Sequence, residues 1–130
     1  MKTFDVTNGH LFVVFPLEIK PGMDFEEMKQ QLTESKIPFV ETDSYNLFQF
    51  IYLNGIKFDN KTFHLEVYFD KKRLKAISFD FVCEPGYEIS FEQWVAGLLG
   101  AATECSWGRL KADWHPKFDV PLIHLSYDLP

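Results

Sequence analysis

The stretch TFHLEVYFDKKRLKAISFDFV, residues 62–82, decides the fold of this chain. From 63 to 69 every second residue is apolar, and the residues between them form the opposite side: His64, Glu66, Tyr68 and Asp70. After the basic link Lys71–Arg73 the alternation returns, with apolar residues at 77, 79 and 81. A repeat of two residues is typical of a half-buried strand. Two such runs joined by so short a link predict an antiparallel hairpin with one face in water.

Length and composition predict one domain that spans residues 1–130. A chain of 130 residues buries roughly two-thirds of its unfolded surface, so a single core can form without disulfides or a metal. The composition is 46% hydrophobic and includes 14 Phe, which excludes a disordered chain.

Net charge limits the classes of partner that this chain can bind, and cysteine content indicates its cellular compartment. Nineteen acidic and 13 basic side chains give a net charge of -6, which repels phosphate backbones and anionic membranes. We therefore expect neither nucleic acid nor membrane as a partner. The first residues lack the apolar core of a signal peptide. Cys83 and Cys105 fit neither a CxxC motif nor a disulfide framework, so we expect reduced thiols and a cytoplasmic protein.

The N-terminal third predicts a strand and a helix. Residues Leu11–Leu17 are apolar on both faces, and Pro16 places this strand at an edge or a bulge. Asp24 is an N-cap residue with Glu27 at the capping-box position, and the helix is expected to end near Ser35. Its apolar stripe is narrow, as in a helix that lies on a sheet: Phe25, Met28 and Leu32.

The next segment predicts a loop and a central strand. Pro38 prevents a further helical turn, and the polar run Glu41–Ser44 is expected to form a loop that offers a contact surface. Asn46–Leu53 is apolar on both faces, which predicts a central strand. Asn54-Gly55 is expected to turn the chain into Ile56–Phe58.

The C-terminal half predicts a second helix and two strands. Pro85-Gly86 favours a type II turn, and a helix capped by Ser90 is expected to continue to Ala102 with a broad apolar stripe. Trp107–Ala112 and Val120–Tyr127 are expected to be strands, with a loop from Trp114 to Lys117 between them. We therefore predict an α+β fold in which two helices pack on one face of a largely antiparallel sheet.

The polar side of the hairpin is one candidate site. His64, Glu66 and Tyr68 share a strand face with Asp80, and His124 joins them if its strand is a neighbour. Such a group could bind a metal or transfer protons. The spacing matches neither a helical zinc motif nor the deaminase motif with its later PCxxC, and any open sheet carries alternating polar residues. We therefore predict no catalytic residue, metal or cofactor, and keep this face as an alternative site.

Loops that combine acidic and aromatic residues form the leading candidate interface, because loops keep side chains free for binding. Trp107 is expected to pack into the sheet. Trp114 is either an interface anchor or a lid over the core, and Tyr87 is the second expected anchor. Three carboxylates are expected to form the charged rim that steers a basic partner: Asp43, Glu84 and Glu88.

Several stretches carry a resemblance to known proteins. They are FHLEVYFDKKRLKAI at 63–77, SFEQW at 90–94, Trp107-Gly108 and PLIHLSY at 121–127. With these, the chain resembles small uncharacterised proteins of Gram-negative bacteria, some encoded beside polymorphic or contact-dependent toxins as immunity proteins. The resemblance implies an acidic cytoplasmic domain that blocks a toxin by covering its active or substrate-binding surface.

The leading hypothesis is thus a non-enzymatic protein-binding domain, specifically an immunity protein whose partner is a basic toxin domain. The alternative is a small enzyme or ligand-binding domain that uses His64, Glu66, Asp80 and His124. A third class is a structural subunit that forms an isologous dimer. The sequence leaves open whether the chain is a monomer or a dimer.

Overall fold

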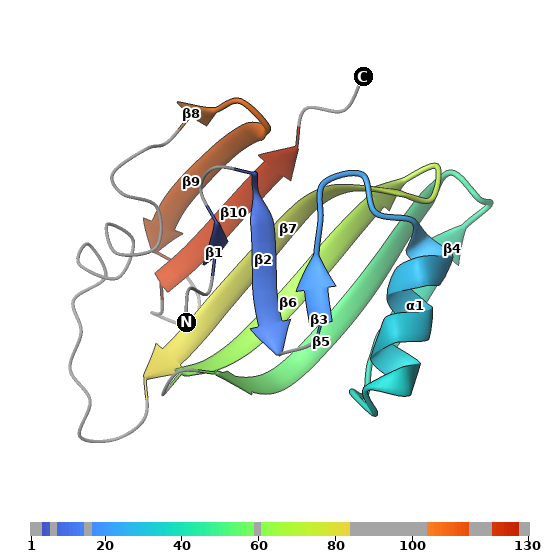
Figure 1. Ribbon diagram of the computed structural model, residues 1–130, viewed down its shortest axis with the longest axis horizontal. Coiled ribbons are helices and arrows are strands. Elements are labelled where there is room, and N and C mark those ends of the chain that lie inside the picture. Colours follow the sequence, from blue (N-terminus) through green and yellow to red (C-terminus); the bar gives the residue numbers. More distant parts are fainter. Residues whose placement is uncertain are drawn as a thin grey trace.

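The computed structural model describes residues 4–5, 8–14, 17–58, 61–83, 104–114 and 121–127, with side chains for 8–11, 18–56, 62–80, 104–111 and 122–127. These residues form two sheets and one helix (Figure 1). The small sheet has the order β1-β2-β3 and the large sheet the order β4-β5-β6-β7-β10-β9-β8. Every neighbouring pair of strands is antiparallel.

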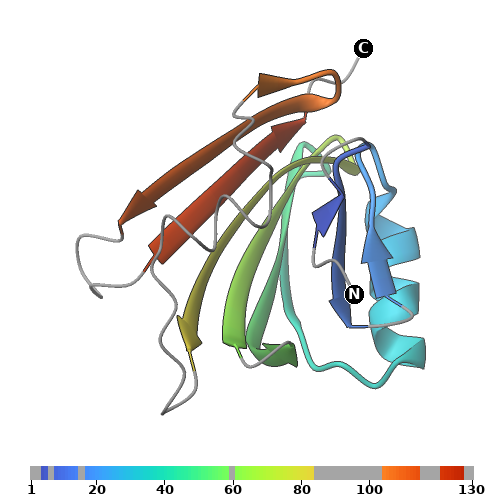
Figure 2. The same cartoon turned by 60° about the vertical axis from the view of Figure 1, so that its left-hand side comes forward.

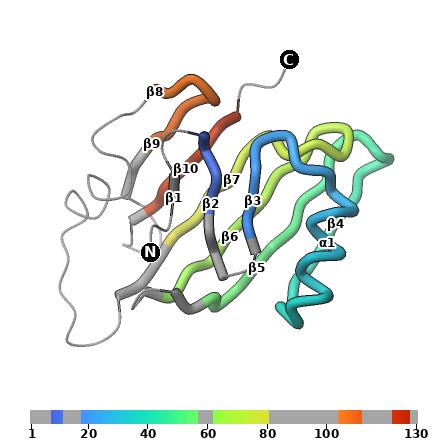
Figure 3. Tube along the Cα trace, in the orientation of Figure 1, coloured from blue at the N-terminus to red at the C-terminus, as the bar shows by residue number. Residues whose placement is uncertain are grey.

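The elements follow one another along the chain as the tube in Figure 3 traces them. The small sheet and the helix come first: β1 (Phe4–Asp5), β2 (His10–Val14), β3 (Leu17–Ile19) and α1 (Phe25–Glu34). The large sheet takes the rest: β4 (Val40–Ser44), β5 (Phe48–Phe58), β6 (Lys61–Asp70), β7 (Arg73–Cys83), β8 (Glu104–Cys105), β9 (Gly108–Trp114) and β10 (Pro121–Tyr127).

The predicted hairpin is confirmed as β6 and β7. Its apolar side is buried as the alternation requires: Phe63, Leu65, Val67, Phe69, Ile77 and Phe79. Lys71 and Lys72 connect the strands with φ of 52° and 67°. Positive φ at both central residues defines a type I′ turn, whose twist matches that of the flanking strands. The short basic link thus fixes the register in which Asp70 faces Arg73.

The first predicted helix is also confirmed. The Asp24 carboxylate accepts hydrogen bonds from the backbone N–H groups of Glu26 at 2.9 Å and Glu27 at 3.2 Å. This satisfies two of the donors that a helix start leaves unpaired. The ring of Phe25 lies 5.2 Å from that of Phe69, edge to face. The apolar stripe of α1 is therefore buried against the large sheet.

The helix and the small sheet cover the same face of the large sheet (Figure 2). At the β9 and β10 side of the molecule, the small sheet packs on the ring of Trp107 near Gly9. The Trp107 ring in turn lies 5.4 Å from the ring of Tyr127. The buried Tyr127 hydroxyl donates to the Gly9 carbonyl at 2.9 Å, and burial raises the pKa of this phenol, which keeps it a donor. Gly9 has φ of 78°, and a Cβ there would lie 2.6 Å from the Trp107 ring, so the contact requires glycine.

Three sequence predictions in the N-terminal half are wrong in detail. Leu11–Leu17 is not one strand, because β2 ends at Val14 and β3 pairs back on it from Leu17. The predicted loop Glu41–Ser44 lies in the edge strand β4, where pairing with β5 overrides its weak strand propensity. Asn54-Gly55 does not turn the chain. It forms a bulge inside β5, where Gly55 has φ of 73°.

In the C-terminal half, the sequence predicts the two strands β9 and β10 correctly but places the ends of β9 wrongly. Trp107 packs on the core as expected, but it lies in the turn before β9. Trp114 is the last residue of β9 and pairs with Pro121, so it is not in a loop. The predicted helix Ser90–Ala102 lies outside the described residues. Among the described residues α1 is the one helix, and together with the antiparallel strands it gives an α+β domain. No helix among the described residues has the length and apolar character needed to cross a membrane.

The packing of α1 can be tested with two leucines. Leu32 is fully buried and Leu47 is 50% exposed. We expect Leu32→Ala to lower the free energy of unfolding by about 2 to 5 kcal/mol, because it leaves a cavity in the core. Leu47→Ala should change it by less than about 0.5 kcal/mol. Urea unfolding measures both, and equal losses would contradict this placement of α1.

Candidate functional site: the open face of the large sheet

The face of the large sheet away from α1 and the small sheet, here called the open face, carries the candidate site. Strand pairing arranges its side chains in rows. In the central row Tyr52 faces Glu66, Glu66 faces Ser78, and Ser78 faces His124. Four strands, β5, β6, β7 and β10, thus contribute one side chain each. Directly opposite residues in antiparallel strands lie within side-chain contact, so the row is a continuous surface.

Four aromatic rings gather on the β5 and β6 part of this face, here called the aromatic patch: Phe48, Phe50, Tyr52 and Tyr68. Phe50 is central, with its ring 5.2 Å from Tyr68 and 6.0 Å from Tyr52. The patch reaches solvent, since Phe48 is 45% and Tyr52 37% exposed. Partial burial raises the pKa of both tyrosines, with Glu66 adding to the effect at Tyr52.

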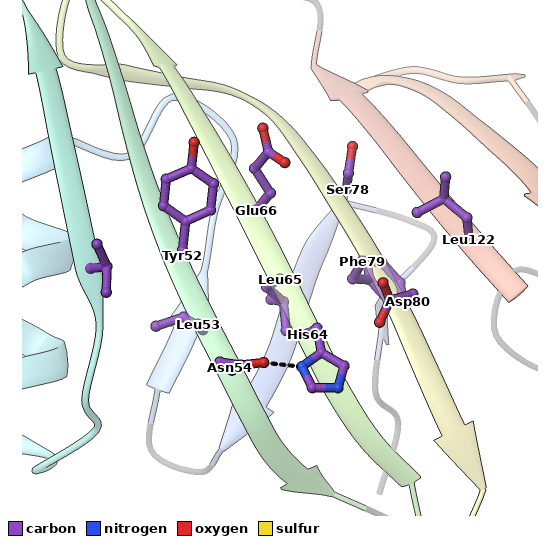
Figure 4. Close-up of a pocket in the computed structure, with 11 residues that line it drawn as sticks. Tyr52, Leu53, Asn54, His64, Leu65, Glu66, Ser78, Phe79, Asp80 and Leu122 are labelled. Atoms are coloured by element: carbon purple, nitrogen blue, oxygen red, sulfur yellow. Dashed lines mark hydrogen bonds between the residues drawn. The ribbon is translucent and has the colours of Figure 1, made fainter. Parts of the chain in front are cut away.

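Two grooves that are partly open to solvent cross the open face. The first has a volume of about 650 Å³ and runs past Tyr52, His64, Glu66, Ser78 and Asp80 (Figure 4). The second, of about 360 Å³, lies between the aromatic patch and β10 and contains Lys75 and His124. Glu66 and Ser78 line both grooves and separate them.

Ser78 and His124 are in direct polar contact on the open face. Ser78 Oγ lies 2.5 Å from Nδ1 of the imidazole. Burial and the positive charge of Lys111 lower the pKa of His124, against a weaker opposite effect of Glu66. A neutral imidazole protonated on Nε2 can accept a hydrogen bond from the serine hydroxyl at Nδ1, which is the first half of a nucleophile pair. No carboxylate among the described side chains is hydrogen-bonded to the imidazole to orient it as a catalytic base.

The structure brings the sequence-predicted residues of this face together only in part. Glu66 and His124 share the central row through Ser78, and His64 faces Asp80 in the next row. The His64 imidazole, however, contacts the Asn54 side chain (Figure 4). Within the described residues, no three His, Cys, Asp or Glu side chains are grouped closely enough to hold a metal ion.

Sequence reasoning identified Tyr68 as a residue of this face but missed the other three rings of the aromatic patch and Ser78. Phe50 and Tyr52 were visible as the second apolar face of the strand from 46 to 53, but that face was assigned to a buried interior. A strand with one covered face and one exposed aromatic face produces the same pattern.

The residues of the predicted loop interface lie in different settings. Asp43 is in β4, where its Oδ1 accepts from the Asn46 N–H and from the Gln49 amide, both at 3.1 Å. This carboxylate therefore stabilises the turn between β4 and β5. For Trp114 the structure describes only the backbone. Glu84, Tyr87 and Glu88 lie outside the described residues.

Comparison with protein-family models, with curated proteins and with solved structures finds no match to this chain.

The protonation of His124 is a direct test of this geometry. Because burial and Lys111 both disfavour the imidazolium, an NMR titration should give a midpoint below 6.5, and Lys111→Met should move it upward. In the unfolded chain the imidazole takes up its proton at higher pH, so stability should fall as the pH drops below about 6.5. A midpoint above 6.5 would contradict the described environment.

Proposed function

We propose that this chain is a non-enzymatic protein-binding domain that docks its partner on the open face. The aromatic patch is the observation that carries the proposal. Tyrosine and other aromatic rings are enriched where proteins bind one another, because they bury much apolar area and lose little side-chain entropy. Here four such rings lie together and reach solvent on a single face.

The shape of the face favours a macromolecule over a small substrate. Small-molecule sites are concave and bury most of their ligand. Both grooves of the open face are partly open to solvent and lined by residues of several strands. A partner surface can cover such a face. The polar residues farther from the patch, such as Asp80, would then form the rim.

The alternative, a small enzyme or ligand-binding domain, draws support from the Ser78–His124 contact. A serine nucleophile needs a base that is itself oriented, and donors for the developing oxyanion. His124 could supply the base, but no carboxylate among the described side chains is hydrogen-bonded to its imidazole to orient it. Hydrolysis of activated esters that is lost in Ser78→Ala would favour this alternative.

Within the binding class, we propose a cytoplasmic immunity protein that neutralises a bacterial toxin by covering its active or substrate-binding surface. Support comes from the net charge of -6 and from the resemblance carried by residues 63–77 and 121–127. Carboxylates raise the association rate with a basic partner such as a nuclease domain. The residues predicted from the sequence as a loop interface remain a second candidate surface for the same partner: Asp43, Glu84, Tyr87, Glu88 and Trp114.

The experiment is co-expression with the protein encoded by the adjacent gene. If that protein is a toxin, this chain should restore growth and co-purify with the toxin domain. A toxic neighbour that is neither bound nor inhibited would reject the immunity proposal. A stable homodimer that buries the open face would indicate instead a structural subunit.

The docking surface is tested by Tyr52→Asp, which places a charge on the aromatic patch. We expect dissociation of the complex to become at least about tenfold faster, as for loss of an aromatic anchor. Gln30→Asp is the control, because Gln30 is exposed on α1, on the opposite side of the large sheet. Surface plasmon resonance measures both variants. Equal rates in the two variants, with the fold intact by circular dichroism, would exclude the open face.

A further inference from the structure

The carboxylate of Glu66 stands at the centre of the open face, and no Lys, Arg or His among the described side chains forms an ion pair with it. Its side chain is exposed and points out between Tyr52 and Ser78 (Figure 4). The ion pairs among the described residues are formed by other carboxylates, at Glu18, Glu26 and Glu41. A charged group in the middle of a proposed interface must be compensated when water leaves, or it weakens binding.

Aromatic rings border this carboxylate. Tyr52 lies directly opposite Glu66 on β5, and Tyr68 lies two residues along β6 on the same face. Phe50 connects the two, with its ring 5.2 Å from Tyr68 and 6.0 Å from Tyr52. Because Tyr52 and Glu66 face each other across paired strands, the negative charge of Glu66 adds to the effect of burial in raising the pKa of Tyr52. A cation placed here meets a carboxylate and the face of a ring together.

The guanidinium group of arginine fits this combination better than the ammonium of lysine. It is planar, binds a carboxylate with two parallel hydrogen bonds, and stacks on aromatic faces. It is also more weakly hydrated than an ammonium, which matters in a groove open to water.

The charges along the two grooves indicate where this group enters. The first groove adds a second carboxylate, that of Asp80, together with the Asn54 side chain. The second groove contains Lys75, which would repel a cation. A cation that binds Glu66 is therefore favoured electrostatically in the first groove over the second.

We propose that Glu66 and Tyr52 form a receptor for an arginine side chain of the protein partner, with the guanidinium bound to the carboxylate and stacked on the ring in the first groove. This inference rests on the proposed function, and it states the chemistry that the partner presents at the centre of the interface.

The test uses small probes and the full chain. N-acetyl-arginine amide is titrated into the ¹⁵N-labelled protein at low ionic strength, where surface charges are least screened. We expect saturable shifts of the Tyr52, Glu66 and Ser78 amides with a dissociation constant of about 1 mM, the range for a ligand of this size. The matched probe is N-acetyl-citrulline amide, which has nearly the same shape and no charge, and should bind at least about tenfold more weakly.

Two isosteric variants localise the effect. Glu66→Gln keeps the shape of an exposed side chain and should weaken arginine binding by about tenfold or more, whereas Glu34→Gln on α1 should leave it unchanged. Equal affinity for arginine and citrulline, or full affinity in Glu66→Gln, would overturn the receptor.

The outcome also separates this inference from the proposed function. If Tyr52→Asp disrupts a complex with a protein partner while Glu66→Gln and the arginine probe have no effect, the receptor is rejected and the docking surface stands. If arginine binds at Glu66 while partners bind undiminished to Tyr52→Asp, the proposed docking surface is rejected and the receptor for arginine is supported.

Discussion

The buried amide of Gln49 joins the two hairpins of the large sheet, and the registers on both sides of β5 depend on it. Its Oε1 accepts from the Lys72 N–H at 2.7 Å, in the turn between β6 and β7, and its Nε2 donates to Asp43 in β4. It is the one fully buried polar side chain in the described part of the chain. Because strand side chains alternate, a slip of one residue would exchange the covered and open faces of β5. The contacts of Gln49 oppose that slip, and so keep the aromatic patch on the outside.

The parts of the fold that could be predicted from sequence are those set by local chemistry. The alternation in β6 and β7 and the Asp24 cap of α1 each act within a few residues, so the pattern carries the information. β4 could not be predicted, since its residues from 40 to 44 are all exposed and it exists through pairing with β5. Asn54-Gly55 has the composition of a hairpin turn. Only the continued pairing of β5 with β6 makes it a bulge.

The candidate site likewise contains some residues that could be predicted from local sequence and others that could not. Glu66 and Asp80 were predictable as members of the polar side of the hairpin. The contact between Ser78 and His124 spans 46 residues and depends on β10 lying beside β7, which no local pattern indicates. The exposure of the aromatic patch depends on how many layers cover the sheet. That number is a property of the whole fold, and the tendency of apolar residues to be buried does not determine it.

The hydrogen bond between the Tyr127 hydroxyl and the Gly9 carbonyl has a consequence for how the chain matures on the ribosome. The two residues are 118 positions apart, and β10 separates β7 from β9 in the large sheet. At 5 to 20 residues per second, the N-terminal strands wait about 6 to 24 s for the strand that holds them. Once β7 has been made, it lacks its partner strand β10 until residues 121–127 emerge, and unpaired strand edges make nascent chains prone to aggregate.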